Sequence, residues 1–235
     1  MRCFSFCAVS LQRSGLLAAA VWLACSVVVA QAPRTPTSTE PKTLEALLTG
    51  FGQLQGLRAR FVEEKKIALL KRPLRSEGTV AFAAPGLLVR RAEKPEPATL
   101  LLDGEVLTVA DASGQRRIDL QESAIVRHFV LTFVNVLRGD RAALERAYAL
   151  VFELTPAGWK LQLTPKTAEL RRFVARAVLE GHGSSVDRMT LEEENGDVTQ
   201  TVFSEVDPNA RFDANERART FKLDTTAAPG RGAER

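Results

Sequence analysis

The chain has 235 residues, of which 26% are charged and 45% are hydrophobic, and its formal net charge at pH 7 is +4. Acidic and basic residues are interspersed along it, so no stripe of lysine and arginine marks a nucleic-acid-binding face. A chain of this length can bury enough surface to fold as one domain without disulfide bonds or a structural metal.

The first 30 residues have the pattern of a secretory signal. Arg2 and Arg13 precede an uncharged apolar run, residues 16–30, that ends in small side chains. This run is shorter than the roughly 20 residues that a membrane-spanning helix needs. Val28 and Ala30 fit a small-residue cleavage site, which predicts export from the cytoplasm with cleavage near Ala30.

All three cysteines lie upstream of that cleavage site, at positions 3, 7 and 25. The mature chain, beginning at Gln31, therefore folds without disulfide bonds, although its oxidising compartment would allow them. Cys25 follows a small residue, as a lipid-modified cysteine would. Because Trp22 stands where a lipobox has leucine and apolar residues continue beyond Cys25, we interpret Cys25 as part of the signal and keep a lipid anchor as the alternative.

Composition divides the mature chain into one domain with two polar ends. Residues 31–41 are rich in proline, threonine and serine and lack an apolar period, which predicts a flexible leader. Residues 225–235 have the same character and predict a disordered tail. The folded domain is therefore expected over residues 42–224.

An amphipathic helix opens the domain, since leucine and phenylalanine recur at three- and four-residue steps over residues 44–54. From residue 58 the period changes to two, with Phe61, Glu63 and Lys65 on one face of a strand. Further strands are predicted over residues 78–84, 87–91, 99–102 and 106–109, the last two joined by an Asp103-Gly104 hairpin turn.

A second helical pattern spans residues 122–138, where apolar side chains cover most of the helix circumference. Asp140 is a candidate N-cap for a short helix over residues 141–148. The later strands are expected over residues 151–154, 159–163, 173–179, 186–193 and 198–206, with a hairpin turn at Asn195-Gly196-Asp197. About ten strands and two or three helices in this order predict an α+β fold, in which a strongly curved antiparallel sheet wraps around helices.

Few side chains offer a catalytic or metal centre. His128 and His182 lack a motif partner, and the mature chain has no cysteine nucleophile. The sequence contains no metal-ligand spacing such as HxH or HExxH. We interpret the glutamates at 192–194 and the arginine pairs at 90–91 and 171–172 as surface charges, and we expect no enzyme activity, cofactor or metal.

Apolar residues exceed what one buried face of a curved sheet requires. Residues 100–102, 106–109 and 151–152 are largely apolar on both sides of their strands, and the helix over residues 124–137 adds more. Either ordinary core packing or a ligand-holding cavity between sheet and helix would account for this surplus.

A strand led by Gly78 ends at Pro85, a second proline follows at Pro95, and an apolar strand then closes in Asp103-Gly104. This spacing resembles that of the periplasmic outer-membrane lipoprotein carrier family, LolA. Similar segments elsewhere extend the resemblance over roughly residues 42–221; they are residues 57–61, 159–165 and 196–203.

The resemblance implies an incomplete, half-open antiparallel β-barrel with helices forming a lid over an apolar cavity. In this family the cavity holds the acyl chains of a lipoprotein, and a monomeric carrier takes them through the periplasm from an inner-membrane exporter to an outer-membrane acceptor. Two positions depart from the family, since Ala84 replaces an arginine and Arg90 replaces an aromatic residue. The departures leave open a lid that closes differently or a cargo other than a lipoprotein.

The predicted lipid-binding residues follow one face of each strand, together with an i, i+4 pair on the lid helix. They are Phe61, Val80, Phe82, Leu88, Leu101, Leu107, Phe129, Phe133 and Phe152. Two other functions stay open at this point. One is a periplasmic binding or sensor module of the same fold that recognises proteins, and the other is an outer-membrane lipoprotein receptor anchored through Cys25.

Overall fold

The computed structural model describes residues 40–122 and 124–223, which belong to one compact unit. Side chains at 124–126, 128 and 129 are not described. The predicted export signal, Cys25, most of the predicted leader and the predicted tail lie outside the described residues. Within the described part of the chain, no helix has the length and apolar character needed to cross a membrane.

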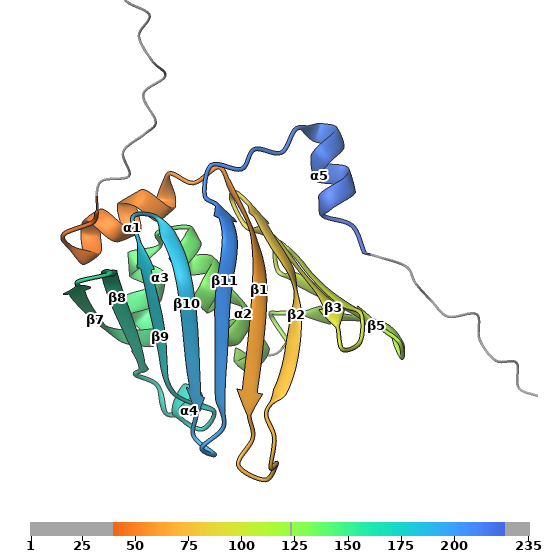
Figure 1. Ribbon diagram of the computed structural model, residues 1–235, viewed down its shortest axis with the longest axis horizontal. Coiled ribbons are helices and arrows are strands. Elements are labelled where there is room, and N and C mark those ends of the chain that lie inside the picture. Colours follow the sequence, from red (N-terminus) through yellow and green to blue (C-terminus); the bar gives the residue numbers. More distant parts are fainter. Residues whose placement is uncertain (1–39, 123, 224–235) are drawn as a thin grey trace, which may run out of the picture. The chain divides into compact units, whose positions relative to one another are not determined.

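The strands of the described residues form one antiparallel sheet in the order β6-β5-β4-β3-β2-β1-β11-β10-β9-β8-β7. The edge strands β6 and β7 are not neighbours in this order, so the sheet curves without closing (Figure 1). The strands are β1 (Gly56–Lys66), β2 (Leu74–Ala83), β3 (Leu87–Lys94), β4 (Ala98–Asp103), β5 (Val106–Asp111), β6 (Gly114–Asp119), β7 (Tyr148–Thr155), β8 (Gly158–Pro165), β9 (Val174–His182), β10 (Ser185–Glu193) and β11 (Val198–Asp207). The predicted incomplete antiparallel barrel is therefore confirmed.

The pairing of β1 with β11 joins the first and last halves of the sheet. Phe61 lies opposite Phe203 of β11 on one side and opposite Gly78 of β2 on the other. A Cβ atom at Gly78 would lie 1.8 Å from the carbonyl oxygen of Arg91, so only glycine allows β2 and β3 to approach here. The predicted hairpin turns also form, with Gly104 at φ +60° and Gly196 at φ +86°.

Within residues 40–122 and 124–223, five helices accompany the sheet: α1 (Leu44–Gly52), α2 (Ala124–Leu137), α3 (Arg141–Ala147), α4 (Ala168–Arg171) and α5 (Ala214–Thr220). The first three confirm the sequence prediction to within two residues at most ends, whereas α4, α5 and strand β6 were not expected. Figure 1 shows α2 behind the central strands, between the two halves of the curved sheet.

Helix α1 packs its apolar face on one end of the sheet. The Thr43 hydroxyl accepts a hydrogen bond from the backbone N–H of Ala46 and begins the helix. Phe51 is fully buried and meets the edge of the Trp159 ring, with 5.8 Å between ring centroids. The Trp159 indole N–H donates to the carbonyl of Gly183 at 3.0 Å, so this core contact has no unpaired polar group.

Candidate functional site

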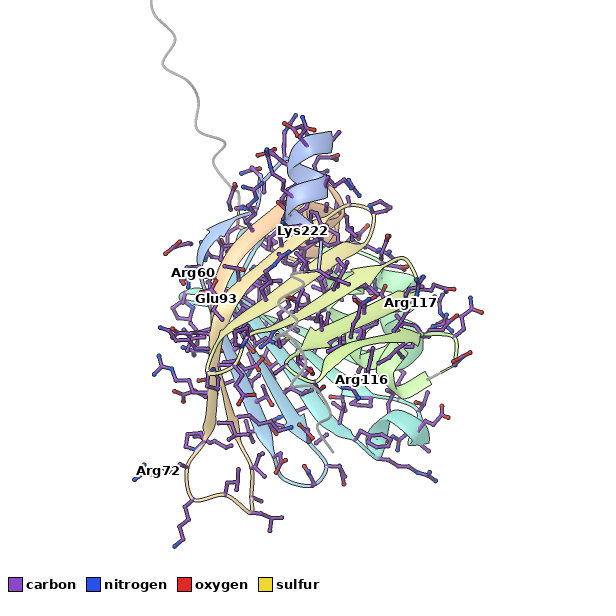
Figure 2. The ribbon with its side chains drawn as sticks, turned by 90° about the vertical axis from the view of Figure 1, so that its right-hand side faces the viewer. Arg60, Arg72, Glu93, Arg116, Arg117 and Lys222 are labelled. Atoms are coloured by element: carbon purple, nitrogen blue, oxygen red, sulfur yellow. The ribbon has the colours of Figure 1, made fainter. Side chains whose placement is uncertain are left out.

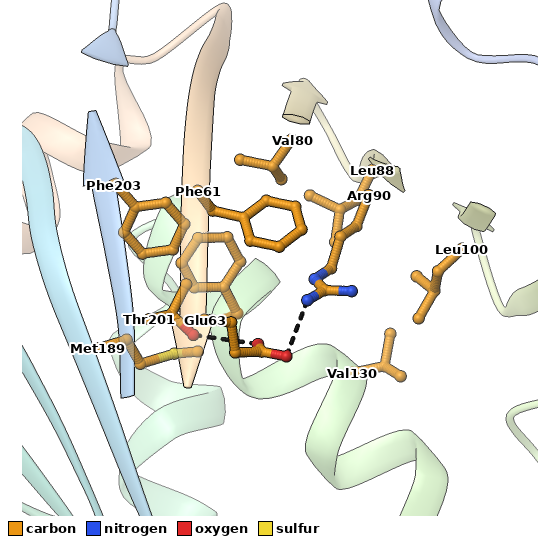
Figure 3. A pocket seen from close by; sticks show the side chains of 11 residues that line it. Phe61, Glu63, Val80, Leu88, Arg90, Leu100, Val130, Met189, Thr201 and Phe203 are labelled. Carbon is orange, nitrogen blue, oxygen red and sulfur yellow. Dashed lines mark hydrogen bonds and ion pairs between the residues drawn. The ribbon is translucent and has the colours of Figure 1, made fainter. Parts of the chain in front are cut away.

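A pocket of about 240 Å³ lies between α2 and six neighbouring strands, from β4 through β1 to β10 (Figure 3). Eight of the eleven side chains around it are apolar. The lining residues are Phe61, Glu63, Val80, Leu88, Arg90, Leu100, Val130, Phe133, Met189, Thr201 and Phe203.

Strand alternation explains how these side chains meet. Residues two apart on one strand share a face, and the pocket takes such pairs from β1, β3 and β11. Helix α2 supplies the opposite wall through Val130 and Phe133, which are three residues apart. The ring of Phe133 stacks on that of Phe203 with centroids 6.1 Å apart and planes at 14°, so the helix and the sheet meet directly beside the pocket.

An ion pair stands inside this apolar lining. A guanidinium N–H of Arg90 donates to Glu63 Oε1 at 2.9 Å, while the Thr201 hydroxyl donates to Oε2 at 3.1 Å (Figure 3). The guanidinium carbon lies 4.1 Å from the centroid of the Phe61 ring. The Arg90 and Glu63 side chains are only 31% and 27% exposed, so solvent screens their attraction less than that of a surface pair.

The interpretation of Arg90 as a surface charge is therefore wrong. Arg90 shares the inner face of β3 with Leu88, and the neighbouring Arg91 lies on the other face. There Arg91 donates to the backbone carbonyls of Thr220 and Lys222 at 2.8 and 2.7 Å.

Four of the predicted lipid-binding residues line the pocket: Phe61, Val80, Leu88 and Phe133. The side chain of Phe129 is not described. The others lie elsewhere. Phe82 and Leu107 are 1% and 3% exposed and belong to the solid core, whereas Phe152 packs on edge strand β7 and is absent from the pocket lining.

The choice of Leu101 was wrong by one residue. Leu100 lines the pocket and Leu102 is fully buried, which places Leu101 on the opposite face of β4. Sequence reasoning also missed Glu63 and Thr201, although both share a strand face with a pocket phenylalanine two residues away. The remaining missed residues are Arg90, Leu100, Val130, Met189 and Phe203.

Polar contacts hold α2 and its C-terminal end against the sheet. Within α2, Thr132 Oγ1 lies 2.7 Å from the phenol oxygen of Tyr148 at the start of β7. Just beyond its end, the Arg138 guanidinium donates to the carbonyl of Pro85 in the β2–β3 turn.

Among the described residues, the contacts of His182 and of possible metal ligands bear on catalysis. His182 Nδ1 lies 2.7 Å from Asp187 Oδ2, but the two side chains are 62% and 44% exposed and no hydroxyl nucleophile is bonded to the ring. No group of three or more histidine, cysteine or carboxylate side chains within the described ranges could hold a metal ion.

The sequence of residues 37–223 matches the family described as "Outer membrane lipoprotein carrier protein LolA-like". The chain belongs to this LolA-like family. The match spans the curved sheet and every helix among the described residues of the LolA-like protein, so it covers both walls of the pocket. No curated protein sequence matched the chain.

The solved structures that match the chain are distant in sequence. A LolA superfamily protein from Nitrosomonas europaea is 13% identical and has a TM-score of 0.41; the alignment covers 77% of the LolA-like chain described here and 98% of the Nitrosomonas chain. Lipoprotein LppX of Mycobacterium tuberculosis is 13% identical, covers 72% and 98%, and has a TM-score of 0.41. The MucA/MucB complex of Pseudomonas aeruginosa is 17% identical, covers 68% and 54%, and has a TM-score of 0.32.

Proposed function

We propose that this LolA-like protein is a periplasmic carrier that binds the acyl chains of a lipoprotein, or of a related lipid, between α2 and the sheet. The apolar pocket is the observation that carries the proposal. Burying one sixteen-carbon chain is worth on the order of 12 kcal/mol at about 0.8 kcal/mol per methylene, so such a cargo does not cross water uncovered.

In this proposal, α2 moves away from the sheet when a long acyl chain enters. Small-molecule sites usually measure about 300–1,000 Å³, and this pocket measures about 240 Å³. The space in this closed state therefore suits part of one acyl chain. A longer chain needs α2 to shift away from the sheet, which would break the Phe133–Phe203 stacking and the Thr132–Tyr148 contact.

The ion pair supplies a polar end for the cargo. Arginine carries five N–H donors, and the pocket-facing guanidinium of Arg90 uses one nitrogen, Nη2, for both Glu63 and Ser76. A remaining N–H can donate to the ester or amide carbonyl that joins an acyl chain to its parent molecule. The chain would then lie along Phe61, Leu88 and Phe133 with its linkage at Arg90.

In this role the carrier receives its cargo from an inner-membrane exporter and delivers it to an outer-membrane acceptor. The family match supports that route, and the unclosed sheet is compatible with it. No cofactor is needed, because transfer requires only that the acceptor bind the acyl chain more tightly than the pocket does.

The test is to purify the protein after export, without detergent, and to identify bound lipid by mass spectrometry. We expect stoichiometric acylated lipid in the wild-type protein. Phe133→Glu should lose it, because a carboxylate would enter the apolar pocket, and Val130→Trp should lose it by filling the space. Leu154→Glu is the matched control, since Leu154 is 57% exposed on β7, and it should retain lipid.

Two results would contradict the carrier proposal. One is a wild-type protein free of lipid that also fails to bind added acylated peptide. The other is equal lipid retention by Phe133→Glu and Leu154→Glu. A stable protein partner isolated without any lipid would instead favour a binding or sensor module.

A further inference from the structure

The loop between β1 and β2 exposes apolar side chains to water. Leu69 is 94% exposed, Leu70 is 48% exposed, and Leu74 at the start of β2 is 53% exposed. Figure 1 shows the loop extending past the ends of the neighbouring strands, and Figure 2 shows Arg72 on it, at the end of the molecule opposite α5. Such side chains gain free energy from any apolar partner that removes them from water.

Basic residues surround these leucines. The segment 66–75 contains Lys66, Lys71, Arg72 and Arg75 and no acidic residue. Apolar side chains flanked by lysine and arginine suit a bilayer interface, where leucine enters the acyl boundary and the cations meet lipid phosphates.

A second segment adds to the same end of the fold. Phe173, between α4 and β9, is 39% exposed and follows the exposed Arg171 and Arg172. The turn between β10 and β11 links the two segments, since the Glu194 N–H donates to the carbonyl of Phe173 at 3.1 Å and the Ala68 N–H donates to Asp197 Oδ1 at 3.0 Å. We call residues 66–75 and 171–173 together the basic rim.

Three carboxylates near the basic rim are paired with a cation or buried. Glu193 pairs with Lys65 at 2.6 Å, Glu192 pairs with Arg176 at 2.7 Å, and Asp197 is 7% exposed. Glu169 and Glu194 are the exposed carboxylates beside the rim. The rim itself contains six basic residues and no acidic ones, so its net charge stays positive after these two are counted.

We propose that the basic rim docks reversibly on a bilayer that contains anionic lipid, with Leu69 and Leu70 inserted among the headgroups. Charge complementarity and the exposed leucines select this partner. Docking also places the pocket close to the bilayer. Glu63 is six residues before Leu69, which spans at most about 20 Å at 3.3 Å per residue.

The test is sedimentation with vesicles of phosphatidylcholine and phosphatidylglycerol in equal parts, compared with vesicles of phosphatidylcholine alone. The protein used in this assay begins at Gln31. It therefore lacks the apolar run at residues 16–30 but contains all of the described residues. We expect binding to the anionic vesicles, weakening as salt is added. Equal binding to both vesicle types, or no binding, would overturn the proposal, and no binding would point to a protein partner for the loop.

Charge variants test whether vesicle binding depends on the basic rim or on the positive charge of the protein as a whole. Lys71→Gln with Arg72→Gln should weaken vesicle binding about 25-fold, because each basic residue near an anionic surface contributes about fivefold. Arg116→Gln with Arg117→Gln removes the same charge from exposed β6, which Figure 2 shows well apart from Arg72, and should change binding little. An equal loss in both double variants would refute a specific rim.

Apolar variants test insertion. Leu69→Ser with Leu70→Ser should weaken binding about tenfold or more, since leucine burial would be lost. Val151→Ser with Leu154→Ser is the matched control, because these side chains are 47% and 57% exposed on β7. Unchanged binding of the Leu69 and Leu70 variant, with an unchanged melting temperature, would overturn insertion. Vesicle binding requires no cargo, so its failure would leave the carrier proposal standing.

Discussion

Replacing Arg90 with methionine tests whether the ion pair in the pocket supports the closed fold. The substitution keeps an unbranched apolar stem but removes the cation beside Glu63 and above the ring of Phe61. Glu63 would keep the hydroxyls of Thr201 and Ser76 as hydrogen-bond donors, at 3.1 and 3.3 Å, but would lose its counter-charge.

The expected cost follows from these contacts. A hydrogen bond to a charged group contributes about 1.5–3 kcal/mol, and a cation–π contact contributes about 0.5–2 kcal/mol. Both side chains are about 30% exposed, so partial hydration of Glu63 offsets some of this loss. We expect Arg90→Met to lower the free energy of unfolding by about 2 kcal/mol.

Adding Glu63→Gln should recover much of that loss, because a neutral amide leaves no unpaired charge in the pocket. The assay is denaturant unfolding followed by the fluorescence of Trp159, which is 1% exposed and is the single tryptophan after residue 30. A loss below about 0.5 kcal/mol for Arg90→Met, or simple addition of the two single losses in the double variant, would refute the reasoning.

Three further predictions concern α2 and the sheet. Burial raises the pKa of Tyr148, the single tyrosine, so tyrosinate absorbance should appear above pH 10 in the folded protein. The free energy of unfolding should fall over the same range as the pH rises, and a titration midpoint equal to that of the protein in denaturant would contradict this prediction. Arg138→Met should speed hydrogen exchange in the last turn of α2 but not in β10, as it removes the bond to the β2–β3 turn. Gly78→Ala should cost about 3 kcal/mol or more in thermal unfolding, against about 1 kcal/mol for Gly104→Ala, where a Cβ meets nothing; equal costs would refute the close approach.

The sequence indicated the inner face of a strand wherever apolar and polar residues alternate. Phe61 was chosen for the inner face of its strand and lines the pocket, whereas Glu63 on the same face was missed because its charge gave no apolar signal. The run at residues 100–102 is apolar throughout, so period-two reasoning could not choose between its faces. Strand β6 has one apolar residue, Ile118, and was missed because β-strands without a buried face have no periodic signal.

The role of Arg90 was beyond local pattern reasoning for another reason. Its partner, Glu63, is 27 residues away and reaches it only because β1, β2 and β3 pair in one register. Similarly, the contact between Arg138 and Pro85 joins residues 53 positions apart. Sequence alone supplied the types of side chain for the pocket, but long-range strand pairing decided which of them meet.

The two edge strands, β6 and β7, affect the size of the cargo that the proposed carrier could bind. A closed barrel has a fixed circumference, so a wider lumen would require breaking inter-strand hydrogen bonds. Here β6 and β7 are not paired with each other, so a change in the curvature of the sheet need not break the pairing of any neighbouring strands. In the proposed carrier, a bulkier cargo would then be accommodated by a change in sheet curvature that disturbs side-chain packing against α2 rather than strand pairing.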